Sequence, residues 1–132
     1  RASTPTMLME MLSQLSSYEL VMIETTGLEL EANLKTFAKL IPQAKQHLVI
    51  SADASETSAN RYLANEAINW TSVMLTQLES DVFPWAVVNT LMASPVPLSL
   101  ASSSSSVTKE AISVDGFSLT ENALLNLPLS AI

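Results

Sequence analysis

The chain has no cysteine, and its 132 residues include only one histidine, His47, and two glycines, Gly27 and Gly116. Many catalytic, metal-binding and phosphate-binding sites are built from these residue types. Their scarcity argues against an enzyme, and the sequence predicts no catalytic residue, no metal ligand and no bound cofactor. Because no disulfide can form, cysteine usage does not assign the protein to an oxidising or a reducing compartment.

Charged residues are also few, at 14% of the chain, whereas hydrophobic residues make up 48%. This composition is too apolar for a disordered chain, and the length suits one domain with a buried core. Six basic and 13 acidic residues give a net charge of −7. Such a surface repels phosphate backbones and anionic lipids, so we expect no nucleic-acid partner.

The spacing of apolar residues predicts an all-α protein. The Thr4-Pro5 pair is a typical helix start, Pro42 should kink or break the second helix, and Trp70 lies in the middle of the third apolar stripe. Short connections between antiparallel neighbours then predict an up-down four-helix bundle. The four helices are expected over residues 5–26, 28–50, 55–79 and 82–94.

The composition changes after the fourth helix. The sequence predicts a helical bundle over residues 1–94, a Pro/Ser-rich linker over 95–106 and a C-terminal docking tail over 107–132. The linker contains the serine run Ser102–Ser106, which is typical of a flexible spacer. In the tail, which we expect to be extended and partly irregular, Asp115-Gly116 is the residue pair of a short β-hairpin turn. Pro128 ends a short apolar segment near the C-terminus.

Neither His47 nor the sequon at Asn69 predicts a functional site. A di-iron bundle needs Glu-x-x-His twice, but this chain has one histidine, and Gln43 and Ala44 stand where an acid is required. We therefore interpret His47 as a surface residue beside a helix C-terminus. Asn69-Trp70-Thr71 matches a glycosylation sequon, but it falls inside an expected helix rather than a surface loop.

A charge-free stretch carries the strongest functional hypothesis. Residues 82–108 contain no charged side chain, but prolines 84, 95 and 97 exclude a membrane-spanning helix from it. Its apolar first part, residues 82–92, is either a central core helix or a contact for a partner, a ligand or a membrane surface. The partner-binding candidates, including three from the tail, are Phe83, Trp85, Val88, Leu91, Met92, Phe117, Leu124 and Leu125.

A cysteine-free acidic bundle with a proline-serine break before a separate tail resembles the extrinsic lumenal subunits of algal photosystem II. The resemblance covers the helix layout of residues 4–94 and the tail after Pro95. Its nearest local likeness is a tryptophan-containing helix that runs into an apolar segment ending at Ser94-Pro95. It implies photosynthesis and a thylakoid-lumen location, and it implies no catalytic residue. The start at Arg1, without a methionine, also leads us to expect an exported or organelle-imported protein after processing.

The sequence therefore predicts a non-enzymatic accessory or structural subunit that docks on a larger assembly through protein–protein interaction. If the resemblance holds, that assembly is a membrane-associated photosystem, and peripheral contact with the membrane is left open. The alternative is a carrier of a small apolar ligand, because flexible methionines can line an adaptable cavity in a helical bundle. The methionines considered for that cavity are Met11, Met22, Met74 and Met92.

Overall fold

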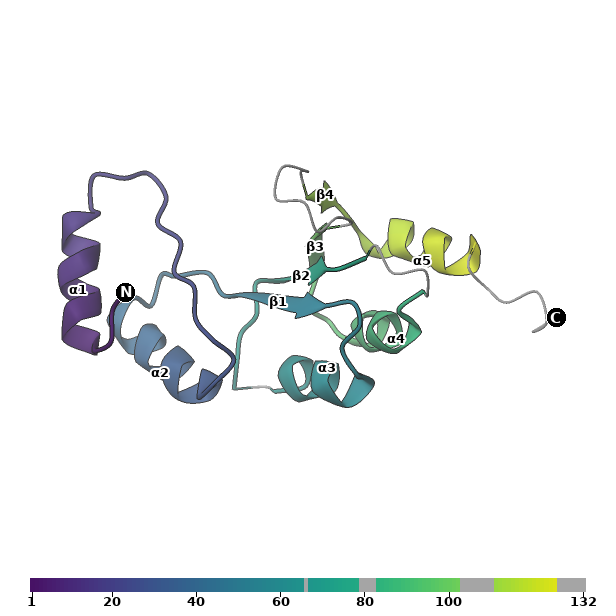
Figure 1. The fold of residues 1–132 in the computed structure, drawn as a ribbon, viewed down its shortest axis with the longest axis horizontal. Coiled ribbons are helices and arrows are strands. Elements are labelled where there is room, and N and C mark those ends of the chain that lie inside the picture. The colour runs from purple at the N-terminus through teal and green to yellow at the C-terminus, as the bar shows by residue number, and fades with distance from the viewer. Residues whose placement is uncertain (66, 79–82, 103–110, 126–132) are drawn as a thin grey trace. The chain divides into compact units, whose positions relative to one another are not determined.

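The computed structural model describes residues 1–65, 67–78, 83–102 and 111–125 (Figure 1). The chain divides into two compact units, residues 1–44 and residues 45–132, which we call unit 1 and unit 2. Across the described residues there are five helices and a four-stranded mixed sheet. The predicted all-α four-helix bundle is therefore wrong, and the protein has an α/β fold.

Unit 1 contains helices α1 (Pro5–Gln14) and α2 (Leu30–Leu40). The expected start of α1 is confirmed, because the Thr4 side chain accepts a hydrogen bond from the Met7 N–H at 3.2 Å. However, α1 ends at Gln14, far short of residue 26. The following segment is rich in serine and β-branched residues, which lower helix propensity because they compete for backbone hydrogen bonds or lose rotamer freedom.

The second expected helix also ends early. Helix α2 ends at Leu40, just before Pro42, so the break predicted there is confirmed. Its predicted continuation to residue 50 is wrong, because strand β1 (His47–Ser51) occupies that part of the chain in unit 2. The apolar run Leu48-Val49-Ile50 is short and contains two β-branched residues, which favours a strand.

Unit 2 is built on strands β1, β2 (Ser72–Thr76), β3 (Leu98–Ala101) and β4 (Ile112–Ser113), in that spatial order. The first three are parallel, and β4 is antiparallel to β3. Ile50 lies opposite Leu75, which in turn lies opposite Ala101, so these three residues mark one level of the sheet. The carboxyl ends of β1, β2 and β3 therefore meet at one edge.

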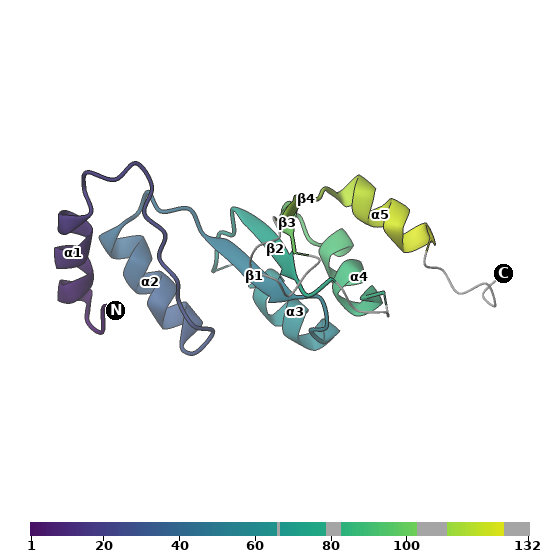
Figure 2. The same ribbon diagram turned by 45° about the horizontal axis from the view of Figure 1, so that its top comes forward.

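Helices α3 (Glu56–Leu63) and α4 (Trp85–Ala93) connect the parallel strands and lie side by side on one face of the sheet (Figures 1 and 2). Right-handed crossovers between strands added in one direction place both helices on the same face. The third expected helix, residues 55–79, is thus wrong in extent: it is divided into α3, an irregular segment and β2. A fourth helix is expected over residues 82–94; α4 is present there and ends before Ser94-Pro95 as expected, but it begins only at Trp85, so Pro84 precedes the helix and does not lie in its first turn.

The core of unit 2 lies between the sheet and these two helices. Alternate residues of each strand face the helices. On the helix side, Val87 and Val88 of α4 are fully buried. Trp70 is buried as expected, but it belongs to the segment before β2, where its indole Nε1 donates to the Tyr62 carbonyl at 3.0 Å. The buried hydrophobic strand residues are Leu48, Ile50, Val73, Leu75 and Ala101.

The residues expected to form a linker and a tail contribute to the same fold. Strand β3 comes from the expected linker and β4 from the expected tail. The hairpin predicted around Asp115-Gly116 is wrong: Gly116 lacks the positive φ that a two-residue hairpin turn requires, and it begins helix α5 (Gly116–Leu125) instead. Residue 82, at which the fourth expected helix starts, residues 103–106 of the serine run and Pro128 lie outside the described residues.

Candidate functional site

The eight partner-binding candidates fall into three groups in the structure. Val88 and Leu91 are buried in the core of unit 2, which fits the core-helix alternative for residues 82–92 and leaves these two side chains out of reach of a partner. Helix α4 contacts α3 and α5, and its buried residues also include Val87 and Thr90. Phe83 and Trp85 are half-buried at the start of α4. The exposed candidates are Met92, Phe117, Leu124 and Leu125.

Three of the exposed candidates lie together on α5. Phe117 and Leu124 are about two helical turns apart and share one side of the helix, with Leu125 next to it. Their side chains are 74%, 62% and 83% exposed, whereas Leu119, on the opposite side, is 5% exposed. Glu121 is exposed within the same side. We call Phe117, Glu121, Leu124 and Leu125 the outer face of α5.

Asp115 fixes the start of α5. Its Oδ1 accepts hydrogen bonds from the Ser118 N–H and from the Ser118 hydroxyl, both at 2.8 Å. These bonds stabilise the carboxylate, so the Ser118 backbone bond first and its side-chain bond second hold the pKa of Asp115 below its usual value. Asp115 therefore caps the start of α5 through short, charge-assisted hydrogen bonds, and the orientation of the outer face depends on this cap.

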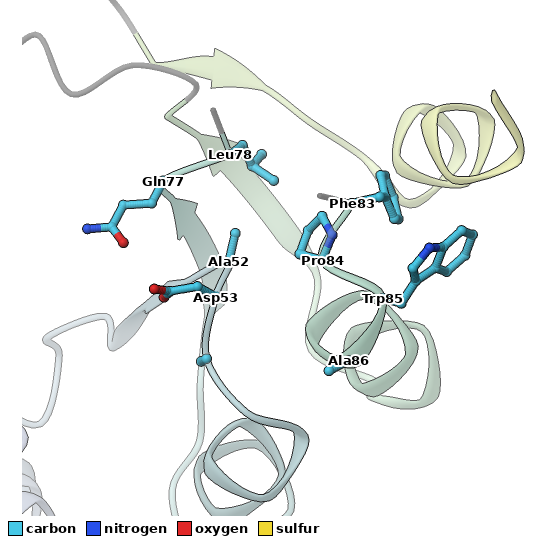
Figure 3. A pocket seen from close by; sticks show the side chains of 9 residues that line it. Ala52, Asp53, Gln77, Leu78, Phe83, Pro84, Trp85 and Ala86 are labelled. Carbon is cyan, nitrogen blue, oxygen red and sulfur yellow. The ribbon is translucent and has the colours of Figure 1, made fainter. Parts of the chain in front are cut away.

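A second candidate site is a cavity of about 390 Å³ at the carboxyl ends of β1 and β2 (Figure 3). Asp53 follows β1, Gln77 follows β2, and Phe83 and Trp85 precede and begin α4. In Figure 3, Asp53 and Gln77 lie on one side of the cavity and the two aromatic residues on the other. This is the edge at which open parallel sheets commonly bind ligands.

The polar side of this cavity is organised by Ser51. Its Oγ lies within hydrogen-bond distance of Asp53 Oδ1 and is 2.8 Å from the Gln77 side-chain oxygen. One hydroxyl hydrogen cannot be donated to both oxygens. We therefore assign the Gln77 amide in the reverse orientation, so that its NH₂ donates to Ser51 and Ser51 donates to Asp53.

His47 lies on β1, not beside a helix end as expected, and joins a chain of hydrogen bonds across three strands. Its Nδ1 is 2.8 Å from Ser72 Oγ, which is 2.9 Å from Ser99 Oγ. Ser99 donates to the Val73 carbonyl at 3.1 Å, so Ser72 donates to Ser99 and the His47 N–H donates to Ser72. The imidazole is thus a donor to Ser72 and does not act as its base. This arrangement holds strands together and does not activate a nucleophile.

Other sites can be judged from the described part of the chain. Within it, no three His, Cys, Asp or Glu side chains gather closely enough to hold a metal ion. No described helix is both long and apolar enough to cross a bilayer. Asn69 is exposed in an irregular segment, so its expected position inside a helix is wrong.

Neither a protein-family model nor a curated protein matches this chain. The function of the protein is therefore inferred from the geometry of the sites described above. Sequence reasoning missed Asp53 and Gln77, because they approach each other only when β1 and β2 are paired as parallel neighbours. The one signal for them is a polar residue just after each of two short apolar runs.

Proposed function

We propose that this protein is a non-enzymatic accessory subunit that docks on a larger protein assembly through the outer face of α5. The observation that supports this most is the orientation of α5. Its buried side holds the helix in place through Leu119, while Phe117, Leu124 and Leu125 are largely exposed to solvent. Large side chains grouped on one exposed side of a helix are typical of a helix that binds another protein.

The partner that fits this face is a protein surface with an apolar centre and a basic residue. Phe117 and the two leucines would enter the apolar part, as anchors spaced along a helix do in a hydrophobic groove. Glu121 lies among them, and the chain carries a net charge of −7, so a lysine or arginine of the partner would face it favourably. An acidic surface would be repelled.

The proposal names no particular assembly. The resemblance to photosystem II subunits was based on a helix layout over residues 4–94, and the structure has strands within that range. The location in a thylakoid lumen and the removal of a targeting segment stay predictions.

The ligand-carrier alternative needed a helical bundle with a cavity lined by methionines. The observed fold is not a bundle, and none of the four methionines lines the cavity at the sheet edge.

Site-specific photo-crosslinking in an extract of the source organism tests the proposal. A photoreactive phenylalanine analogue at Phe117 should give a defined product with one other protein. The matched control carries the analogue at Asn60, an exposed position on α3, and should not give that product. Identical products from both positions, or a product that contains only this chain, would contradict the proposal.

The captured protein is then purified and titrated with variants. Phe117→Ser combined with Leu125→Ser should weaken binding at least tenfold, because exposed anchors carry most of the energy of such contacts. Glu121→Lys should weaken binding severalfold and respond to salt, since it reverses a charge within the contact. Val49→Thr, which alters an exposed apolar residue of β1, serves as the control and should leave the affinity unchanged.

A further inference from the structure

The outer edge of strand β1 takes part neither in the sheet of unit 2 nor in the docking role of α5. The strands lie in the order β1-β2-β3-β4, so β1 has a neighbouring strand on one side only (Figure 2). The Val49 side chain, in the middle of β1, is 59% exposed. An edge strand offers its backbone N–H and C=O groups to a further strand. The backbone directions and the charges near β1 decide which strand fits this edge.

The backbone directions follow from the hydrogen bonds at the two ends of β1. The Gln46 carbonyl accepts from the Thr71 N–H at 2.7 Å, and the Ala52 N–H donates to the Thr76 carbonyl at 2.8 Å. The backbone groups of successive strand residues point in alternate directions, so the even-numbered residues of β1 face β2 and the odd-numbered ones face outward. The outward-facing residues are His47, Val49 and Ser51.

The outward-facing backbone groups have little to bond with inside the chain. The Ala54 N–H donates to the Ser51 carbonyl at 3.1 Å, which leaves that oxygen a second lone pair. No other hydrogen bond to these backbone groups lies within the described ranges of the chain. A further strand would therefore meet donors and acceptors at all three outward-facing residues.

Strand β1 lacks the features that usually protect an edge strand against pairing, which are a charged side chain, a proline, a bulge or a very short length. Residues 46–52 contain no charged residue and no proline. The pairing of β1 with β2 is regular over all five residues of the strand. The opposite edge of the sheet differs, because β4 has only two residues. Of the two edges, β1 is thus the one that can add a strand.

A second copy of β1 fits this edge when it runs antiparallel about a two-fold axis at Val49. In that register Val49 lies opposite Val49 of the second copy, and His47 lies opposite Ser51 of the second copy. Each opposed pair exchanges both of its N–H···O bonds, so every outward-facing residue gains a partner. The same surface is then used by both copies, as in most two-fold dimers.

The charges next to β1 favour the same register. Lys45 stands four residues before Val49, Asp53 stands four residues after it, and both charged side chains are exposed. The two-fold axis therefore brings Lys45 of each copy opposite Asp53 of the other. A register centred one residue earlier or later would bring Lys45 opposite a serine, Ser51 or Ser55. Opposite charges at both ends of the pairing counteract the repulsion between two chains of net charge −7.

We propose that two copies of this chain associate through their β1 strands, which pair antiparallel about Val49 and join the two four-stranded sheets into one. The backbone hydrogen bonds hold the strands together, and the contacts between Lys45 and Asp53 of the other copy fix the register. A pairing of five-residue strands is a small interface, so this dimer dissociates on dilution. The proposal is independent of the docking role, because the outer face of α5 does not include β1.

Sedimentation velocity of the full chain, from about 5 µM to about 500 µM, tests the proposal. We expect a reversible equilibrium between monomer and dimer. Val49→Pro should weaken the dimer at least tenfold, because it removes the central outward N–H and no bond to β2. Val49→Thr keeps that N–H and should change the affinity less than twofold. A chain that is monomeric throughout, or a dimer that a folded Val49→Pro leaves unchanged, would overturn the proposal.

An exchange of charges tests the register without a proline. Lys45→Glu and Asp53→Lys should each weaken the dimer at least threefold, and the double variant should return to within twofold of the original affinity. If overall repulsion alone governed association, Asp53→Lys would strengthen the dimer, since it makes the chain less negative. Glu56→Lys makes the same charge change on α3 and should not weaken the dimer. Failure of the double variant to restore the affinity would overturn the register.

Disulfide trapping locates the contact directly, because the chain has no cysteine of its own. Cα atoms of a hydrogen-bonded antiparallel pair are about 5.5 Å apart, which is within the range that a disulfide spans. Val49→Cys should therefore form a covalent dimer under mild oxidation. Glu121→Cys, at an exposed position on α5, should form at least tenfold less at the same concentration. Equal trapping at both positions, or none at Val49→Cys, would contradict the pairing of the β1 strands.

Discussion

Unit 1 and unit 2 use similar apolar side chains in opposite ways. Unit 2 contains 14 of the 15 buried hydrophobic residues that the structure describes, and unit 1 contains the other one, Leu34. Helix α1 buries none of its residues, and unit 1 exposes side chains as large as Met22 and Leu28. A high apolar content therefore does not produce a core by itself. The residues must also be brought together, and in unit 2 the parallel sheet does this.

Separation of the two units should give the largest effect. We expect residues 45–132 alone to unfold cooperatively, because they hold almost the whole core, and residues 1–44 alone to show no cooperative transition. Helices of 10 and 11 residues are marginal in water unless they are packed against other elements. Circular dichroism during thermal unfolding of each fragment measures this. A cooperative transition in residues 1–44 would break the comparison between the units.

A pair of substitutions in the full chain compares the units at single positions. Trp70→Ala should lower the free energy of unfolding by about 3–5 kcal/mol, since it leaves a large cavity and removes the hydrogen bond to Tyr62. Met22→Ala, at a side chain that is 87% exposed, should change it by less than about 0.5 kcal/mol. Denaturant titration gives both values. Similar losses for the two variants would show that unit 1 also has a packed core.

The same comparison can be made within α5, which has a buried and an exposed side. Leu119→Ala should cost about 2–3 kcal/mol, whereas Leu125→Ala should be nearly neutral for stability. The sequence predicts a separate docking tail after the linker, so a chain that ends after Ser106 would still fold. Because Leu119 and Val114 are buried, we now expect that truncation to destabilise unit 2. An unchanged unfolding midpoint after truncation would show that α5 adds nothing to the core.

The sequence predicted local signals well and pairing poorly. The start of α1 at Thr4-Pro5, the break before Pro42 and the end of α4 before Ser94-Pro95 each depend on residues close together in the chain. Strands β1 and β2 were missed because a short apolar run fits a strand or a buried helix equally well. Parallel strands lie far apart in sequence, and their pairing leaves no local signal.

The candidate sites differ in the same way. The sequence pointed to the exposed residues of α5 as partner-binding candidates. They are large apolar side chains in the expected tail, which has too few such side chains to bury them in a core of its own. Asp53 and Gln77 were not expected, because they lie 24 residues apart and meet only through the pairing of Ser51 with Thr76. For Val88 and Leu91 the sequence left a core helix and a partner contact as alternatives, because an apolar helix gives the same pattern in a core and at an interface.

The smallest expected effect concerns the cap of α5 and acidic pH. The Ser118 hydrogen bonds lower the pKa of Asp115 in the folded protein below the usual value of 3.8, so its carboxylate stabilises the fold at neutral pH. That contribution is present above the usual pKa and is lost as the pH falls through the lowered one. We expect Asp115→Ala to lower the unfolding midpoint slightly at pH 7 and to have less effect at pH 2, as differential scanning calorimetry can measure. Glu19→Ala, which removes an exposed carboxylate of unit 1, is the control. An equal effect of Asp115→Ala at both pH values would show that the charge of the cap does not stabilise α5.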